Sequence, residues 1–212
     1  MTIRFAVAAV FLLSSVLSAE VITDPANDFL ASYTGPHNGD LDVISAEVLL
    51  EGSTFTFTST SNAPIGTTPD GVFVWGVNRG SGSQTFPGIA PGVTFDAVVI
   101  IVPGGDSFVL DIDNAGAMSP IPAANISVNG ADLSATVQVS QLPTRGAAPA
   151  DYTVNLWPRS ELLLIDEVIS DFAPDNSNAA VTVIPEPGMF GLVGLGIAGV
   201  FLRRRVSQSR RQ

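Results

Sequence analysis

Two stretches of strict alternation between apolar and polar residues constrain the fold of this chain more than any other feature. In residues 53–60 phenylalanines alternate with threonines, and in residues 132–139 an aliphatic side chain occupies every second position. A period of two places successive side chains on opposite faces of a β-strand. Asn129-Gly130 precedes the second stretch, and this dipeptide between two alternating runs favours a tight hairpin turn. Half-buried strands joined by short turns are therefore predicted.

Further segments of the same kind complete an all-β prediction. No segment before residue 184 shows a sustained helical period with caps, and the loops are rich in glycine, proline and asparagine. Residues 179–183 are expected either to close a sheet or to lead into the tail. The pattern predicts an antiparallel β-sandwich, jelly-roll-like in type. The other predicted strands are residues 43–50, 72–77, 93–102, 106–112, 126–128, 152–157 and, with a short helix as the alternative, 162–169.

The first 19 residues have the features of a secretory signal peptide. Arg4 precedes an apolar run at residues 5–13, and small residues follow up to Ala19. A charged start, a short apolar core and a small-residue end are typical of a segment that is removed on export. We therefore predict a cleaved signal peptide over residues 1–19 and one β-sandwich domain over residues 20–184.

The last 28 residues form a second targeting segment in three parts. Pro185-Glu186-Pro187 comes first, and its prolines forbid a regular helix there. An uncharged, glycine-rich apolar run follows at residues 188–202, and its fifteen residues span about 22 Å as a helix. Arg203, Arg204 and Arg205 come next, and positive charge tends to stay cytoplasmic. This order predicts one transmembrane helix, an arginine-rich cytoplasmic tail and an exported domain.

This tail, residues 185–212, resembles the PEP-CTERM sorting signal of Gram-negative bacteria, and Pro185, Glu186 and Pro187 carry the match. The resemblance implies that the chain is a substrate of an exosortase, a membrane-embedded cysteine protease or transpeptidase that cleaves near the motif. It also implies passage through the Sec machinery and signal peptidase, a transient inner-membrane anchor, and a final place at the cell surface or in an exopolysaccharide matrix. An ordinary stop-transfer anchor is the alternative.

The charge of the predicted domain excludes several classes of partner. Residues 20–184 contain 19 acidic residues and 3 arginines, so their net charge is −16, and the whole chain has no lysine. Such a surface repels nucleic acid and anionic lipid but suits divalent cations and neutral sugars. The chain also has no cysteine, so the domain is not stabilised by disulfides although export would permit them.

Four aspartates in the entry segment suggest a metal site. Asp24, Asp28, Asp40 and Asp42 precede or begin the first predicted strand, and carboxylate oxygens are ligands that calcium prefers. The alternative is a solvated acidic loop in which aspartates cap turns. A second acidic patch with Asp171 and Asp175 is interpreted as solvent-exposed surface. Calcium is the one cofactor that the sequence suggests.

The same entry segment also resembles the opening of DOMON-type β-sandwich modules. The resemblance covers about thirty residues, from Asp24-Pro25 through Gly39-Asp40-Leu41-Asp42 into a strand pair. Members of that group bind sugars, haem or ions, so the resemblance implies a ligand-binding sandwich. It transfers no individual site residue.

The sequence offers little support for catalysis. His37 is the single histidine of the chain and lies among glycine, proline and asparagine, and no Gly-x-Ser-x-Gly motif accompanies a serine. We therefore predict a non-enzymatic protein, processed by an exosortase, with a structural or adhesive role at the cell surface or in the matrix. The alternatives are a carbohydrate- or calcium-binding module and, third, a secreted hydrolase.

Overall fold

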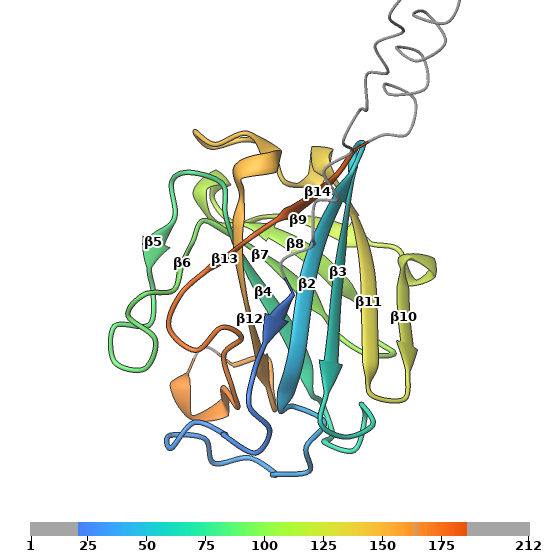
Figure 1. Ribbon diagram of the computed structural model, residues 1–212, viewed down its shortest axis with the longest axis vertical. Helices are drawn as coiled ribbons and strands as arrows, with labels where there is room; N and C mark the ends of the chain where they lie inside the picture. Colours follow the sequence, from blue (N-terminus) through green and yellow to red (C-terminus); the bar gives the residue numbers. More distant parts are fainter. Residues whose placement is uncertain (1–20, 164, 186–212) are drawn as a thin grey trace, which may run out of the picture.

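The two stretches of strict alternation form neighbouring strands of one sheet. The computed structural model describes residues 21–163 and 165–185. Sheet A has the strand order β1-β2-β3-β11-β10, and β14 pairs with β2 on the same edge as β1 (Figure 1). Its strands are β1 (Ile22–Thr23), β2 (Val43–Glu51), β3 (Thr54–Ser61), β10 (Ile126–Asn129), β11 (Asp132–Gln138) and β14 (Thr182–Ile184).

Sheet B lies against sheet A and has the strand order β13-β12-β4-β7-β8-β9. The late strand β12 returns beside β4, as in a Greek key. A separate two-stranded ribbon consists of β5 (Ser83–Gln84) and β6 (Thr94–Phe95). The strands of sheet B are β4 (Val72–Asn78), β7 (Ala97–Ile101), β8 (Ser107–Asp111), β9 (Ala117–Ile121), β12 (Thr153–Arg159) and β13 (Ala179–Ala180).

The prediction of an antiparallel all-β fold is confirmed. Every strand pair is antiparallel except β14 with β2, which is parallel. The described residues contain no α-helix, and none of their helices is long and apolar enough to cross a membrane. The short 3-10 helices are η1 (Ile112–Asn114), η2 (Ala123–Asn125), η3 (Val139–Gln141), η4 (Pro149–Asp151) and η5 (Asp166–Val168).

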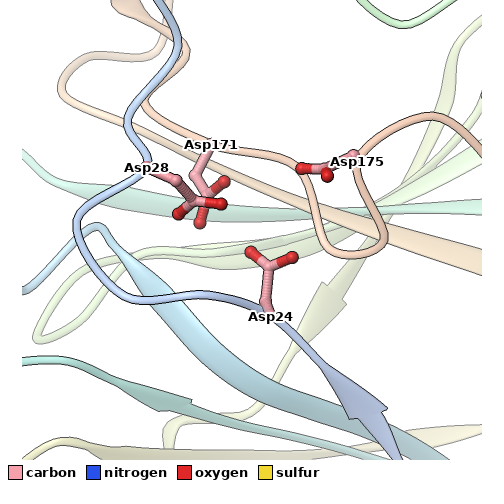
Figure 2. A group of neighbouring side chains, drawn as sticks. All are labelled: Asp24, Asp28, Asp171 and Asp175. Carbon is pink, nitrogen blue, oxygen red and sulfur yellow. The ribbon is translucent and has the colours of Figure 1, made fainter.

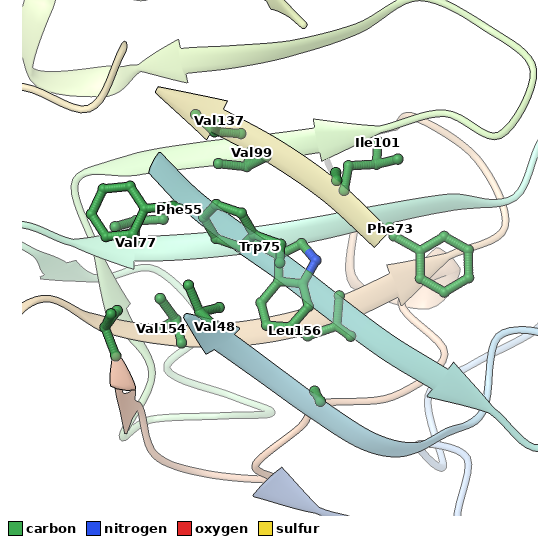
Figure 3. Packing of buried hydrophobic residues seen from close by; sticks show 14 of the residues in the cluster. Val48, Phe55, Phe73, Trp75, Val77, Val99, Ile101, Val137, Val154 and Leu156 are labelled. Atoms are coloured by element: carbon green, nitrogen blue, oxygen red, sulfur yellow. The ribbon is translucent and has the colours of Figure 1, made fainter. Parts of the chain in front are cut away.

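Sheet A buries one face, and this explains its alternating sequence. In β3 every second side chain is buried, and Phe57 pairs with Ala135 of β11 and with Val48 of β2. These side chains meet the inner face of sheet B, from which Trp75 and Leu156 enter the same buried cluster (Figure 3). Trp75 packs edge-on against Phe57 with ring centroids 5.4 Å apart. The outward threonines remain partly exposed, so a period of two is sufficient to define the core of this sheet.

Sheet B buries both faces, and its central strands therefore lack alternation. All five residues of β7 are buried. A second apolar cluster covers the outer face, where Trp157 of β12 packs among Phe95 of β6 and the loop residues Phe86 and Phe172. A Cβ atom at position 76 would overlap the Trp157 ring, so Gly76 of β4 permits this close packing.

The hairpin lies where it was predicted, but its two turn residues are Gly130 and Ala131, one position later than Asn129-Gly130. Asn129 of β10 faces Asp132 of β11, and Gly130 in the turn has φ 63°, which glycine adopts without strain. The predicted strand 93–102 is divided in two at Asp96, which accepts hydrogen bonds from the Arg79 and Ser81 amides and so falls between β6 and β7.

Two strand assignments were wrong. The described residues of the segment 162–169 form no strand but include the short helix η5, because the chain turns after β12 and closes on itself: the Ser160 amide donates to Val168 O and the Ser170 amide donates to Pro158 O. Residues 117–121 were not among the predicted strands but form β9. This strand is the exposed edge of sheet B and contains Pro120, so it has no alternating pattern.

The predicted targeting segments lie largely outside the described residues. The signal peptide at residues 1–19, Glu186, Pro187, the apolar run at 188–202 and Arg203, Arg204 and Arg205 are not described. Pro185 is described, is exposed and directly follows β14.

A buried ion-pair network fastens one end of sheet B. Arg79 is fully buried and contacts Asp96 at 2.5 Å and Asp111 at 2.6 Å, and it also donates to the carbonyls of Asp96 and Pro143. Arg145 contacts the other oxygen of Asp111 at 3.0 Å, but a third of its side chain is exposed. The network joins the ends of β4, β7 and β8 to the loop at residues 143–147.

We expect Arg79→Ala to lower the free energy of unfolding by about 3–5 kcal/mol, because it leaves the buried carboxylates of Asp96 and Asp111 without their main partner. Arg145→Ala is the matched control and should cost about 1 kcal/mol or less, because that pair is partly solvated and Arg79 still holds Asp111. Urea unfolding followed by tryptophan fluorescence measures both. Equal losses in the two variants would contradict this account of the network.

Candidate metal centre

Four aspartates from the two ends of the domain converge beside the start of β2. Asp24 follows β1, and its amide donates to Ile44 O at 3.1 Å. Asp28 follows a tight turn in which Asn27 has φ 66°. Asp171 and Asp175 come from the segment between η5 and β13. One carboxylate oxygen from each residue lies within 4.8 Å of the others, and Figure 2 shows the four side chains gathered around a common centre.

The second pair of aspartates is held in place by hydrogen bonds to the sheets. The carboxylate of Asp171 accepts from the Val43 amide at 2.9 Å and from the Phe172 amide at 2.8 Å. The side-chain amide of Asn155, buried in β12, donates to Pro174 O and Ser177 O on either side of Asp175. The strands therefore fix the loop that carries both residues.

The cluster has no compensating positive charge among the described residues. The ion pairs of residues 21–163 and 165–185 all join Arg79 or Arg145 to Asp96 or Asp111, far along the chain from the cluster. The third described arginine, Arg159, donates to Ile165 O. Four carboxylates thus face one another without a basic side chain to neutralise them.

Burial and mutual repulsion raise the pKa of two members of the cluster. Burial, followed by the charges of Asp171 and Asp28, raises the pKa of Asp24 to about 8. Burial is also the largest cause for Asp171, whose pKa rises to about 7 although two backbone amides oppose the shift. Either a proton shared between Asp24 and Asp171 or a cation can relieve the repulsion.

Several oxygens of this region are buried without a hydrogen-bond partner. They are Oδ2 of Asp24, Oδ1 of Asp28 and Oδ1 of the neighbouring Asp42. Desolvating a charged oxygen without a partner is costly, and such groups pair with protons, donors or metals. The chemistry of the donor set, carboxylates without histidine or cysteine, fits a hard divalent cation.

The structure brings together two of the four aspartates that the sequence suggested as ligands. Asp24 and Asp28 belong to the cluster, whereas Asp40 is committed elsewhere: its oxygens accept from the amide and the hydroxyl of Thr68, both at 2.6 Å. Asp42 borders the cluster, and its Oδ2 accepts from the Asn27 amide and the Asn62 side chain.

Sequence reasoning missed Asp171 and Asp175 as members. They were interpreted as solvent-exposed surface, because nothing in the local pattern indicates that residues 171–175 pack against residues 24–43. Their sequence does contain a clue, because they belong to an acidic patch in a late segment of the domain. A late segment can complete the sandwich beside the first strands, and this would have placed the patch near Asp24 and Asp28.

His37 packs against aromatic rings rather than against catalytic partners. Its ring centroid lies 4.2 Å from that of Phe29 and 5.3 Å from that of Tyr33. Within the described residues it makes no hydrogen bond to a serine or a carboxylate, and it is exposed.

One comparison with known proteins identifies the end of the chain. Residues 183–205 match the PEP-CTERM protein-sorting motif. The chain therefore carries this sorting signal, which implies export and processing by an exosortase. No curated protein and no solved structure matches the chain, and the DOMON resemblance finds no support in the comparisons.

We expect the metal-free protein to become less stable as the pH rises from about 4 to about 8. The folded-state pKa values of Asp24 and Asp171 lie above the value of about 3.9 for an unfolded aspartate, so in this window the folded state binds more protons than the unfolded state. The free energy of unfolding therefore falls with rising pH. Asp111 has the opposite shift, since the hydrogen bond from Arg79 lowers its pKa, and its effect lies below pH 4.

Urea midpoints at pH 5, 6, 7 and 8, measured after dialysis against a chelator, check this slope. Asp24→Asn serves as the control variant, because it removes the group with the largest shift and should flatten the decline. Stability that rises over this window, or a slope unchanged in Asp24→Asn, would contradict the assignment.

Proposed function

We propose that this chain is an exported protein of the cell surface or exopolysaccharide matrix of a Gram-negative bacterium, with a structural or adhesive role. The observation that carries the proposal is the sorting motif at residues 183–205. The signal peptide predicted at residues 1–19 would supply the export step, through the Sec machinery and signal peptidase. An exosortase then processes the chain near Pro185-Glu186-Pro187.

The position of β14 supports processing of a folded domain close to the membrane. The motif begins at Val183, and Val183 and Ile184 are strand residues paired in parallel with Leu50 and Glu51 of β2. No spacer separates the last strand from Pro185. Cleavage near the motif would therefore leave sheet A with all of its strands.

The placement of the aromatic residues favours a structural role over sugar binding. Aromatic side chains that bind sugars stack on them from an exposed position, whereas those of Trp75, Trp157, Tyr33 and Tyr152 are all buried. What the domain offers to its surroundings is a polar, strongly acidic surface on a rigid double sheet. Such a surface suits a spacer or scaffold in a hydrated matrix.

A carbohydrate- or calcium-binding module is the alternative function. A hollow of about 340 Å³ lies where the loop before β4 meets the loop after β7, a volume in the range of small-ligand sites. It is lined by polar and apolar residues together, among them Asp40, Thr68, Asp70, Phe73 and Val102. The acidic cluster is the observation that favours calcium. A secreted hydrolase ranks third, because His37 makes no hydrogen bond to a serine or a carboxylate among the described residues.

We expect replacement of Pro185, Glu186 and Pro187 by alanine to leave the uncleaved chain in the inner membrane, because the exosortase would no longer recognise its substrate. Membrane fractionation and immunoblotting in a host that has an exosortase measure the ratio of retained to released protein. The double variant Pro120→Ala with Pro122→Ala is the matched control, since it alters the Pro-Ile-Pro sequence in and after β9. Release of the triple variant at the level of the unaltered chain would refute the sorting proposal.

We also expect an array of soluble glycans to show no saturable ligand for the protein, because a scaffold requires no sugar site. A glycan that binds with saturation, and loses binding when Asp70→Ala alters the rim of the hollow, would favour the carbohydrate-binding alternative. Glycan binding that is unchanged in Asp70→Ala would also contradict the scaffold proposal and would place the site elsewhere.

A further inference from the structure

We propose that Asp24, Asp28, Asp171 and Asp175 bind a Ca²⁺ ion that joins the entry segment to the loop before β13. The inference deepens the calcium-binding alternative by naming its ligands, and it does not depend on the sorting proposal, because it concerns the folded domain. It also replaces the ligand set that the entry segment alone suggested, since Asp40 is satisfied by Thr68.

Asp42 provides evidence for the site that is independent of the cluster. Asp42 is 0 % exposed. Its Oδ2 is held by the Asn27 amide at 2.8 Å and by Asn62 at 2.9 Å, whereas its Oδ1 has no partner. The Asn27 amide fixes this carboxylate next to Asp28. Burial is the largest cause that raises the pKa of Asp28 and of Asp171, and the charge of Asp42 raises both further. A fully buried carboxylate with one unpaired oxygen thus lies beside the cluster.

An unpaired buried charge requires compensation from outside the described side chains. Hydrogen bonds within the region satisfy Asp40 and both oxygens of Asp171, but they leave one oxygen each of Asp24, Asp28 and Asp42 without a partner. A divalent cation neutralises the repulsion of the four inner carboxylates. The free oxygen of Asp42 can then accept a hydrogen bond from a water molecule on the ion.

The ligand chemistry of the cluster favours calcium over magnesium. The four oxygens lie within 4.8 Å of one another, so one ion can contact all of them. Calcium binds oxygen at 2.3–2.6 Å in flexible geometry and accepts several carboxylates. Magnesium requires near-ideal octahedral geometry and dehydrates reluctantly, so it usually binds only one or two carboxylates and keeps several waters. Four carboxylates, each able to bind through one or both oxygens, also meet the six to eight ligands that calcium takes.

The ion would join segments that are far apart in sequence. The Val43 amide and Asp171, 128 positions apart, already form a hydrogen bond, and the Leu30 amide donates to Ser170 O at 2.9 Å. Calcium would add a stronger contact between the same two segments, the one that leads into β2 and the one that leads through β13 to β14. Calcium sites of extracellular modules have dissociation constants of about 10⁻⁴–10⁻³ M, and a site on an exported domain is expected in that range.

The test uses the full-length protein in detergent, freed of metal by chelation and then dialysed. We expect 5 mM CaCl₂ to raise the melting temperature by about 5 °C, and MgCl₂ to raise it less. NaCl at matched ionic strength is the control for charge screening. Titration calorimetry with CaCl₂ should give one site per chain.

Asp28→Asn with Asp175→Asn is the decisive variant, since asparagine keeps the shape of each side chain and removes its charge. In chelator the variant should melt at a higher temperature than the unaltered protein, because two repelling charges are gone, and its calcium shift should disappear. If the carboxylates of Asp28 and Asp175 instead made stabilising contacts within the protein, their replacement would lower the melting temperature in chelator. Asp70→Asn with Asp106→Asn changes the net charge equally at exposed positions outside the cluster, and it should keep the full calcium shift.

Three results would overturn the proposal. The first is a sodium response as large as the calcium response. The second is a calcium shift that persists in Asp28→Asn with Asp175→Asn. The third is a loss of stability of that variant in chelator, which would mean that contacts within the protein already compensate the carboxylates.

Discussion

Strand β2 is the element that holds both ends of the domain. One of its edges pairs with β3, and the other edge is shared by β1 near Ala46 and by β14 from Leu49 to Glu51. The start of the strand also binds Asp171 through the Val43 amide. The first and last strands of the domain and the loop before β13 therefore all depend on this strand being in place, which gives a chain without disulfides a closed structure.

The charges of the domain are divided between two ends of the sandwich. At one end the buried arginine Arg79 and its neighbour Arg145 form ion pairs with Asp96 and Asp111, and the hydrogen bond from Arg79 lowers the pKa of Asp111. At the other end Asp24, Asp28, Asp171 and Asp175 meet without an arginine. The same residue type thus serves as a partner in an ion pair in one place and as an uncompensated charge in the other.

How much could be predicted from the sequence follows from how each strand is buried. Sheet A exposes one face, so its alternation was visible and the turn of its hairpin was predicted to within one position. Edge strand β9 buries little and contains Pro120, so it left no pattern to detect. Residues 162–169 have an apolar composition suited to a strand, yet Leu162 and Leu163 are about half exposed, because composition does not reveal a return of the chain after β12. The candidate site was half predicted for the same reason: Asp24 and Asp28 lie in the entry segment, whereas Asp171 and Asp175 reach it only through tertiary packing.

The parallel pairing of β14 with β2 has a mechanical consequence. Tension applied to the chain at Pro185 acts along the direction of β14, so a pull on this end loads the hydrogen bonds of residues 182–184 in shear, all at once. A strand pulled sideways would instead unzip one bond after another. A domain held by this end is thus loaded in the direction in which a short strand resists force best, and the load passes directly into β2.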